Sequence, residues 1–292
     1  MSSSSRSAAD ATPLAAVPVE VSHLVVPLDG SPFAEHALPV AAWLAEGLGA
    51  DLHLAEVVPQ ARGAEDAIRY LDAVGRRQHA AWELLEGADV AGALAAALGT
   101  AGRVTCMATH GRDRAAGLLG SVAAAVLHRT ARPAVLVGPQ ARAVTASDAP
   151  VVAAVDGTGR DERLVRLALG WATRLGRRLD IVTVAEPTAA DGRKETAPPR
   201  RRWGPPDPEA YVASLAARVE APGVVVTSRA VFDPAGVRDG LLPVLDRTAA
   251  LVVLGCRQPA AGTTMVLGGH AARLVHDARV PALTVPPPTG QR

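Results

Sequence analysis

A chain of 292 residues is long enough for two domains, each with its own core. Hydrophobic residues make up 49% and charged residues 20%, which is typical of a soluble globular protein. The aromatic share of 3% argues against a base-stacking surface for nucleic acid, and the formal net charge of +1 argues against a strong binder of the phosphate backbone.

The first 20 residues carry no apolar stretch of secretory length, and we expect a disordered leader there. No window reaches the roughly 18 apolar residues of a membrane span, so no membrane association is expected. Cys106 and Cys256 each end an apolar run, with no nearby Cys or His at metal-ligand spacing. We therefore expect buried thiols, no metal site and a cytoplasmic location.

Two pairs of similar segments indicate an internal repeat. VVPLDGS at 25–31 returns as VAAVDGT at 152–158, and residues 120–137 return at 268–285. The offsets are 127 and 148, so the second copy contains about 21 additional residues, and repeated units of this kind indicate a duplicated domain.

The additional residues are assigned to 187–208, where Pro, Gly and Arg predict a solvated loop that includes the basic cluster Arg200–Arg202. The predicted domains are 21–139 and 149–288, joined by a polar linker at 140–148.

Apolar runs alternate with segments of helical spacing in both copies. In the first copy, strands are predicted at 23–29, 52–58, 81–86, 104–108 and 133–137, with helices at 37–48, 64–78, 88–98 and 121–130. In the second copy, strands are predicted at 151–156, 179–185, 224–231, 250–256 and 281–285. This alternation predicts an α/β fold, with a mainly parallel five-stranded sheet in each copy and helices on both faces.

Residues 107–122, MATHGRDRAAGLLGSV, leave the fourth strand of the first copy and open the next helix. An open parallel sheet binds ligands at the carboxyl ends of its strands, where the strand order reverses. Gly111 and Gly120 let backbone approach an anion, Ser121 adds a hydroxyl donor, and Arg112 can add a charge. The pattern favours a phosphate at the helix start. The alternative is a plain turn at Gly111 and a helix start at Gly120 with a capping serine.

Asp29 ends the first strand, which lies beside the fourth strand in a doubly wound sheet. Its carboxylate can accept hydrogen bonds from an amino group or a ribose hydroxyl, which points to a nucleotide across the crevice. The simpler alternative is an Asx turn before Gly30 and Ser31, and the two roles are compatible.

Three stretches, VVPLDGSPFAEHALPVAAWLA, MATHGR and LLGSVAAAVLHRTARPAVLV, resemble the universal stress protein family. The family's ATP-binding motif reads Gly, two residues, Gly, nine residues, Gly, then Ser or Thr. The first copy has Ala108, Gly111, eight intervening residues, Gly120 and Ser121. The resemblance covers both copies and implies two flavodoxin-like (Rossmann-like) domains that bind ATP, with or without Mg²⁺.

The resemblance also implies which residues of the first copy hold ATP. Those on the adenine and ribose side are Pro27, Leu28, Asp29 and Val57; those along the ribose and phosphates are Met107, Ala108, His110, Gly111 and Arg112; those on the phosphate are Gly120, Ser121 and Val122.

The second copy keeps the motif's spacing but loses some of its chemistry. It reads Gly255, Gln258, Gly268 and then Gly269 where a hydroxyl is expected. We expect one nucleotide per chain, in the first copy, with the second copy binding at least about tenfold more weakly.

Catalysis has little support in the sequence. The sequence contains no Gly-x-Ser-x-Gly motif, no His-Glu-x-x-His motif and no paired carboxylates at a useful spacing. His110 is the only plausible acid or base beside the loop, so we expect no enzyme activity. The predicted function is a stress-response regulatory module that binds ATP. The alternatives are an interaction module without nucleotide and a slow ATP hydrolase. The resemblance implies that the final strands pair within one chain, between two chains, or both.

Overall fold

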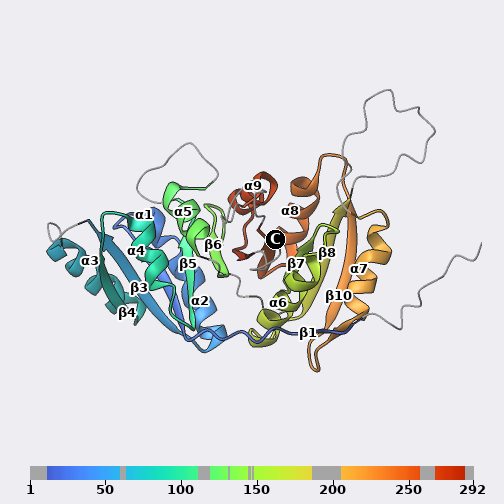
Figure 1. Cartoon of the computed structure of the whole chain (residues 1–292), viewed down its shortest axis with the longest axis horizontal. Coiled ribbons are helices and arrows are strands. Elements are labelled where there is room, and N and C mark those ends of the chain that lie inside the picture. Colours follow the sequence, from blue (N-terminus) through green and yellow to red (C-terminus); the bar gives the residue numbers. More distant parts are fainter. Residues whose placement is uncertain are drawn as a thin grey trace, which may run out of the picture.

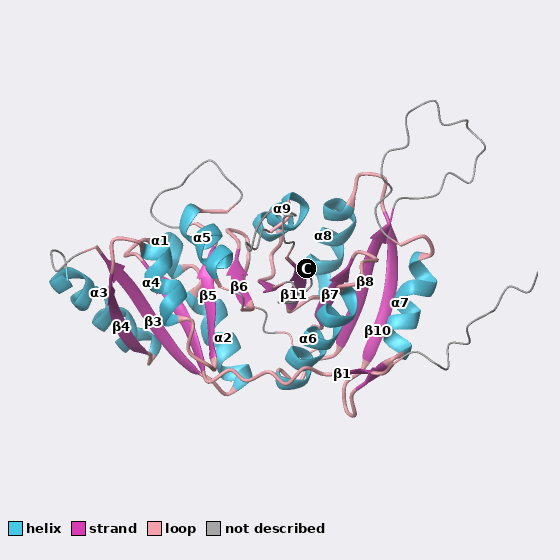
Figure 2. Cartoon of the chain, viewed as in Figure 1, coloured by secondary structure: helices cyan, strands magenta, loops and turns pink. Residues whose placement is uncertain are grey.

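The computed structural model describes residues 12–59, 64–110, 119–130, 132–143, 146, 148–185, 205–256 and 267–286. These residues form one ten-stranded sheet and one two-stranded sheet, with helices on both sides of the larger one (Figures 1 and 2). The predicted α/β fold is confirmed. Most of the predicted insertion, including Arg200–Arg202, lies outside the described residues.

The first copy forms half of the ten-stranded sheet, in the order β4-β3-β2-β5-β6, with all neighbours parallel. Its elements are β2 (His23–Leu28), α1 (Pro32–Glu35), α2 (Leu38–Leu48), β3 (Asp51–Val58), α3 (Ala64–Gln78), β4 (Ala81–Glu86), α4 (Val90–Ala97), β5 (Arg103–Ala108), α5 (Ser121–Arg129) and β6 (Ala134–Val137). Local signals set the ends of its helices. Asp89 accepts a hydrogen bond from the Gly92 N–H at 3.1 Å to begin α4, and Gly49 ends α2 in the left-handed conformation at φ 60°.

The second copy repeats this arrangement in the order β10-β8-β7-β11-β12. Its elements are β7 (Val151–Val155), α6 (Asp161–Arg174), β8 (Leu179–Ala185), α7 (Pro208–Ala217), β9 (Val219–Glu220), β10 (Val226–Phe232), α8 (Val237–Thr248), β11 (Leu251–Gly255), α9 (Gly269–Asp277) and β12 (Ala282–Val285). In both copies the third, second, first, fourth and fifth strands lie side by side, so the internal repeat seen in the sequence is also a structural one. The predicted domain boundaries stay predictions.

The two copies join through their final strands. β6 and β12 pair antiparallel, with Val135 opposite Leu283, and the Thr284 hydroxyl donates to the Ala134 carbonyl at 2.9 Å. The expected contact between final strands is therefore present within the chain, and a homodimer of chains stays a prediction.

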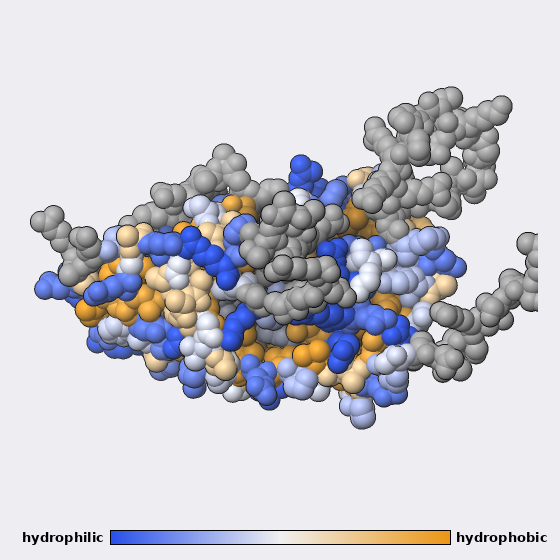
Figure 3. All heavy atoms as spheres, in the orientation of Figure 1, coloured by the Kyte–Doolittle hydropathy of each residue, from blue (hydrophilic) through white to orange (hydrophobic). Residues whose placement is uncertain are grey.

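Two layers of apolar side chains fill the space on either side of the sheet. Helices α2, α3, α6 and α7 contribute to one layer, and α4, α5, α8 and α9 contribute to the other. Cys106 and Cys256 are free thiols inside these layers, and burial raises the pKa of both. On the face seen in Figure 3, hydrophobic residues gather around β4, the edge strand of the first copy.

The N-terminal segment corrects a prediction. β1 (Leu14–Ala15) pairs with β9 in the second copy, and Leu14 is only 2% exposed. Val17 donates its N–H to the Arg166 carbonyl at 3.0 Å, and a Cβ on Gly170 would lie 2.1 Å from the Val17 carbonyl oxygen. The disordered leader is therefore wrong for residues 12–20, because apolar side chains there pack against α6; residues 1–11 lie outside the described part.

The described residues were also searched for membrane-spanning helices and metal-binding clusters. None of the helices there has the length and apolar character needed to cross a bilayer. No group of three or more His, Cys, Asp or Glu side chains in that part of the chain is arranged to hold a metal ion.

Candidate functional site

Each copy has a point at the carboxyl edge of its sheet where the strand order reverses. It lies between β2 and β5 in the first copy and between β7 and β11 in the second. Asp29 follows β2, and Asp156 follows β7, so both predicted carboxylates stand at these points. Ligands of open parallel sheets bind at such positions.

Both aspartates form the expected Asx turn. The Asp29 carboxylate accepts the Ser31 N–H at 2.9 Å, and the Asp156 carboxylate accepts the Thr158 N–H at 3.2 Å. Ser31 then caps α1, because its hydroxyl accepts the Ala34 N–H at 3.2 Å. The turn holds each carboxylate at the crevice, so the structural role supports a binding role and does not compete with it.

Gly120 lies at the start of α5, where backbone segments approach closely. Its N–H donates to the Thr109 carbonyl at 2.6 Å, and a Cβ on Gly120 would lie 2.8 Å from that same oxygen. Only glycine fits without movement of the backbone. The start of α5 has no side-chain cap, and Ser121 and Val122 are exposed beside it. The first N–H groups of this helix are therefore placed to meet an anion.

The remaining predicted residues fall into three groups. Met107 and Leu28 are buried, whereas Pro27, Val57 and Ala108 are half-buried. Since Leu28 pairs with Glu56, Val57 follows on β3 at the level of Asp29. Gly111 and Arg112 lie outside the described residues.

His110 follows β5 and faces the second copy. Its Nδ1 lies 3.0 Å from the Thr109 hydroxyl, and its ring meets that of His276 edge-on, with centroids 6.0 Å apart. Sequence reasoning placed His110 beside the ligand, and the structure also places it at the contact between the copies.

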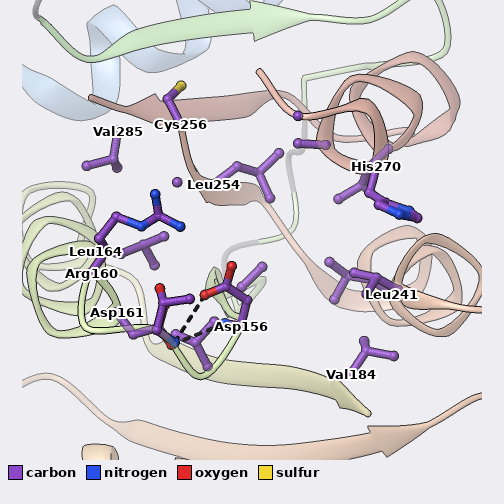
Figure 4. Close-up of a pocket in the computed structure, with 18 of the residues that line it drawn as sticks. Asp156, Arg160, Asp161, Leu164, Val184, Leu241, Leu254, Cys256, His270 and Val285 are labelled. Carbon is purple, nitrogen blue, oxygen red and sulfur yellow. Dashed lines mark hydrogen bonds between the residues drawn. The ribbon is translucent and has the colours of Figure 1, made fainter. Parts of the chain in front are cut away.

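The second copy contains a cavity of about 630 Å³ at its carboxyl edge (Figure 4). Asp156, Gly255, Gly268 and Gly269 line it, so the positions that match the motif converge there. The apolar part of the wall comes from Val182, Val184, Leu241, Leu254 and Leu274. Sequence reasoning missed this cavity, because alternating apolar residues of this kind also predict a packed core. Gln258 lies outside the described residues.

Asp161 fixes the loop that carries Asp156, and its role was also missed. It is 3% exposed, and its Oδ2 accepts hydrogen bonds from the N–H groups of Asp156, Gly157 and Thr158 at 2.7–3.2 Å. The Tyr211 hydroxyl donates to the same oxygen at 2.8 Å. Burial raises the pKa of Asp161 to about 6, while the hydrogen bonds from Tyr211 and the backbone act against that rise. In the sequence, the only sign of this role is that Asp161 lies five positions after Asp156, which begins the Asp-Gly turn.

The second copy matches a known protein family. The sequence model of the universal stress protein family matches residues 149–286. The second copy therefore belongs to the universal stress protein family. The match covers the copy with the poorer ATP motif, and the first copy has the same strand order. No curated protein matches the sequence.

Solved structures resemble the fold of the two copies together. One from Archaeoglobus fulgidus, described as a universal stress protein, has a TM-score of 0.65 at 17% identity and covers 90% of this chain and 97% of that chain. A putative universal stress protein from Pseudomonas aeruginosa has a TM-score of 0.54 at 14% identity, covering 91% of this chain and 93% of that one. A protein of unknown function from the same species also has a TM-score of 0.54, at 13% identity, and covers 91% and 92%. At these identities the likeness concerns the fold alone.

Proposed function

We propose that the chain binds ATP at the carboxyl edge of its first copy and acts as a regulatory module in a stress response. The observation that carries this proposal is the uncapped start of α5. Ser31 and Asp89 cap α1 and α4 with their side chains, whereas Gly120 leaves the N–H groups of α5 available. A helix start of this kind favours a phosphate, through its N–H donors and its dipole.

The rest of the ATP molecule has suitable neighbours in the first copy. Asp29 and Val57 stand at the ends of adjacent strands, where a carboxylate and a backbone edge can meet ribose and adenine. Ser121 adds an exposed hydroxyl beside the helix start. Hydrogen bonds from neutral donors to a charged phosphate contribute about 1.5–3 kcal/mol each, so a few of them suffice for micromolar binding.

We propose binding without turnover. His110, the candidate acid or base, already contacts the Thr109 hydroxyl and the ring of His276. General acid–base catalysis requires a group that reaches the proton it transfers. A slow hydrolase stays the alternative, and steady phosphate release by the purified chain would support it.

The cavity of the second copy favours a second site. Its volume of about 630 Å³ lies within the usual range for small-molecule sites, which is roughly 300–1,000 Å³. The second copy therefore has room for a nucleotide, but Gly269 supplies no hydroxyl to its phosphate. One nucleotide per chain is the expected result if the loss of that hydrogen bond weakens binding in the second copy.

Titration calorimetry of the full chain with ATP tests the proposal through a matched pair of substitutions. Ser121→Asp and Gly269→Asp each place a carboxylate at the exposed first residue of a helix, and a Cβ on Gly269 meets no atom within 4 Å. An acidic residue there suits the helix dipole, so both variants keep their fold. Gly120→Asp is unsuitable, because its side chain would clash with the Thr109 carbonyl.

We expect Ser121→Asp to weaken the tighter ATP site at least about tenfold, because its carboxylate takes the place of a phosphate and repels it. Gly269→Asp should leave that site unchanged. Equal ATP affinity in Ser121→Asp and the parent chain would contradict the proposed site.

A further inference from the structure

Two arginine side chains line the cavity of the second copy without a partner among the described residues. Arg160 precedes α6, and Arg163 lies in its first turn. Within the described part of the chain, neither guanidinium forms a side-chain hydrogen bond or an ion pair. In Figure 4 the Arg160 guanidinium points from α6 into the space between Asp156 and Leu254. Both side chains are only half-exposed.

Two neighbouring arginines on the same copy are paired. Arg218 meets the Glu162 carboxylate at 2.7 Å, and Arg238 meets the Asp277 carboxylate at 2.6 Å. The acidic residues on the cavity wall have other partners. Asp161 accepts three backbone N–H groups and the Tyr211 hydroxyl, and Asp156 accepts the Thr158 N–H.

A bound anion would stabilise these arginines. A helix begins with partial positive charge, so a cation at the start of α6 is repelled by the helix dipole. Partial burial adds to this cost, because a guanidinium loses water and receives no compensating acceptor. A bound anion would remove both costs.

The first copy has no arginine at the two matching positions. At the offset of 127 that relates the two Asp-Gly turns, Phe33 and His36 stand where Arg160 and Arg163 stand. The second copy also has Gly269 where the first has the Ser121 hydroxyl. The two copies thus differ in their polar groups, with a hydroxyl at the start of α5 in the first copy and two arginines at the start of α6 in the second.

We propose that the cavity of the second copy binds a small organic phosphate whose phosphate group lies against Arg160 and Arg163. Two guanidiniums match the charge of a phosphate dianion, and each can present two N–H groups to its oxygens. The apolar wall of Val182, Val184, Leu241 and Leu254 receives the ligand's aromatic or apolar body. This site is additional to the ATP site proposed in the first copy and does not depend on it.

The test is calorimetry on the full chain carrying Ser121→Asp, so that the proposed first-copy site is blocked. The probes are AMP, adenosine, phenyl phosphate and inorganic phosphate. We expect AMP or phenyl phosphate to bind, and the double variant Arg160→Gln/Arg163→Gln to lose at least about tenfold of that affinity. If AMP binds and phenyl phosphate does not, the ligand of the cavity is a nucleotide. If AMP and phenyl phosphate both bind, the cavity accepts aromatic phosphates in general.

Arg273→Gln is the matched control, because Arg273 is exposed on α9 and is not part of the cavity wall. It should bind the probes like the Ser121→Asp parent, and equal melting temperatures verify that all variants are folded. The proposal is overturned if no organic phosphate binds, if the double variant binds as tightly as Arg273→Gln, or if adenosine binds as tightly as AMP. The proposed function is judged separately, by the loss of ATP affinity that Ser121→Asp alone causes.

Discussion

At the scale of single residues, His53 shows how burial links protonation to stability. It lies on β3 with its side chain 14% exposed, and its Nε2 is 3.4 Å from the Glu83 carboxylate. Arg103 donates to that same carboxylate at 2.6 Å, and the His23 ring meets His53 edge-on. Burial lowers the pKa of His53 below its ordinary 6.5; Glu83 acts to raise it, and Arg103 and His23 lower it further.

The sign of the resulting pH dependence follows from linkage. Unfolded His53 takes up its proton at a higher pH than folded His53, so its contribution to stability is lost as the pH falls below about 6.5. We expect the free energy of unfolding of His53→Gln to fall less steeply than that of the parent between about pH 7 and pH 5, in urea titrations. His270→Gln, at an exposed position, is the control.

Asp161 contributes with the opposite sign in an overlapping range. Its raised pKa means that its contribution is present below about 3.8 and is lost as the pH rises through about 6. The difference between parent and variant isolates His53, because Asp161 is common to both. Parallel pH profiles for the parent and His53→Gln would refute this account of His53.

At the scale of elements, the sequence predicts best those segments whose pattern is strong and long. α3 at Ala64–Gln78 and β8 at Leu179–Ala185 have the predicted bounds, because one has a clear helical period and the other a continuous apolar run. β1 and β9 were missed, since two residues carry no period and their pairing depends on Leu14 being buried by a distant part of the chain.

The residues of the candidate sites also differ in how well the sequence predicts them. Asp29 and Gly120 could be found because a strand end and a helix start are local signals. Asp161 could not, since its partner Tyr211 lies 50 residues away. Arg160 resembles any exposed arginine in the sequence, and only the fold shows that a cavity lies in front of it.

At the scale of the whole molecule, the two copies form one continuous sheet through close backbone contact. Val135 on β6 pairs with Leu283 on β12, and the following Gly138 packs against the end of α9. A Cβ on Gly138 would lie 1.9 Å from the Val275 carbonyl oxygen, a distance that atoms cannot occupy without backbone movement. Glycine at 138 therefore allows the copies to dock.

Gly138→Ala should destabilise the chain by at least about 1–3 kcal/mol, which is the usual cost of overpacking, because the added methyl group separates α9 from β6. The matched control is Gly159→Ala, where a Cβ meets no atom within 4 Å. Urea unfolding of both variants gives the comparison. If Gly138→Ala were as stable as Gly159→Ala, the close docking of the copies would be wrong.

The central claim is that ATP binds at the carboxyl edge of the first copy, and a crystal structure of the full chain with ATP tests it most directly. We predict phosphate oxygens within hydrogen-bonding distance of the N–H groups at the start of α5, beside Gly120 and Ser121, with the ribose and adenine between Asp29 and Val57. ATP bound only in the second copy, or density for its phosphates away from α5, would contradict the account.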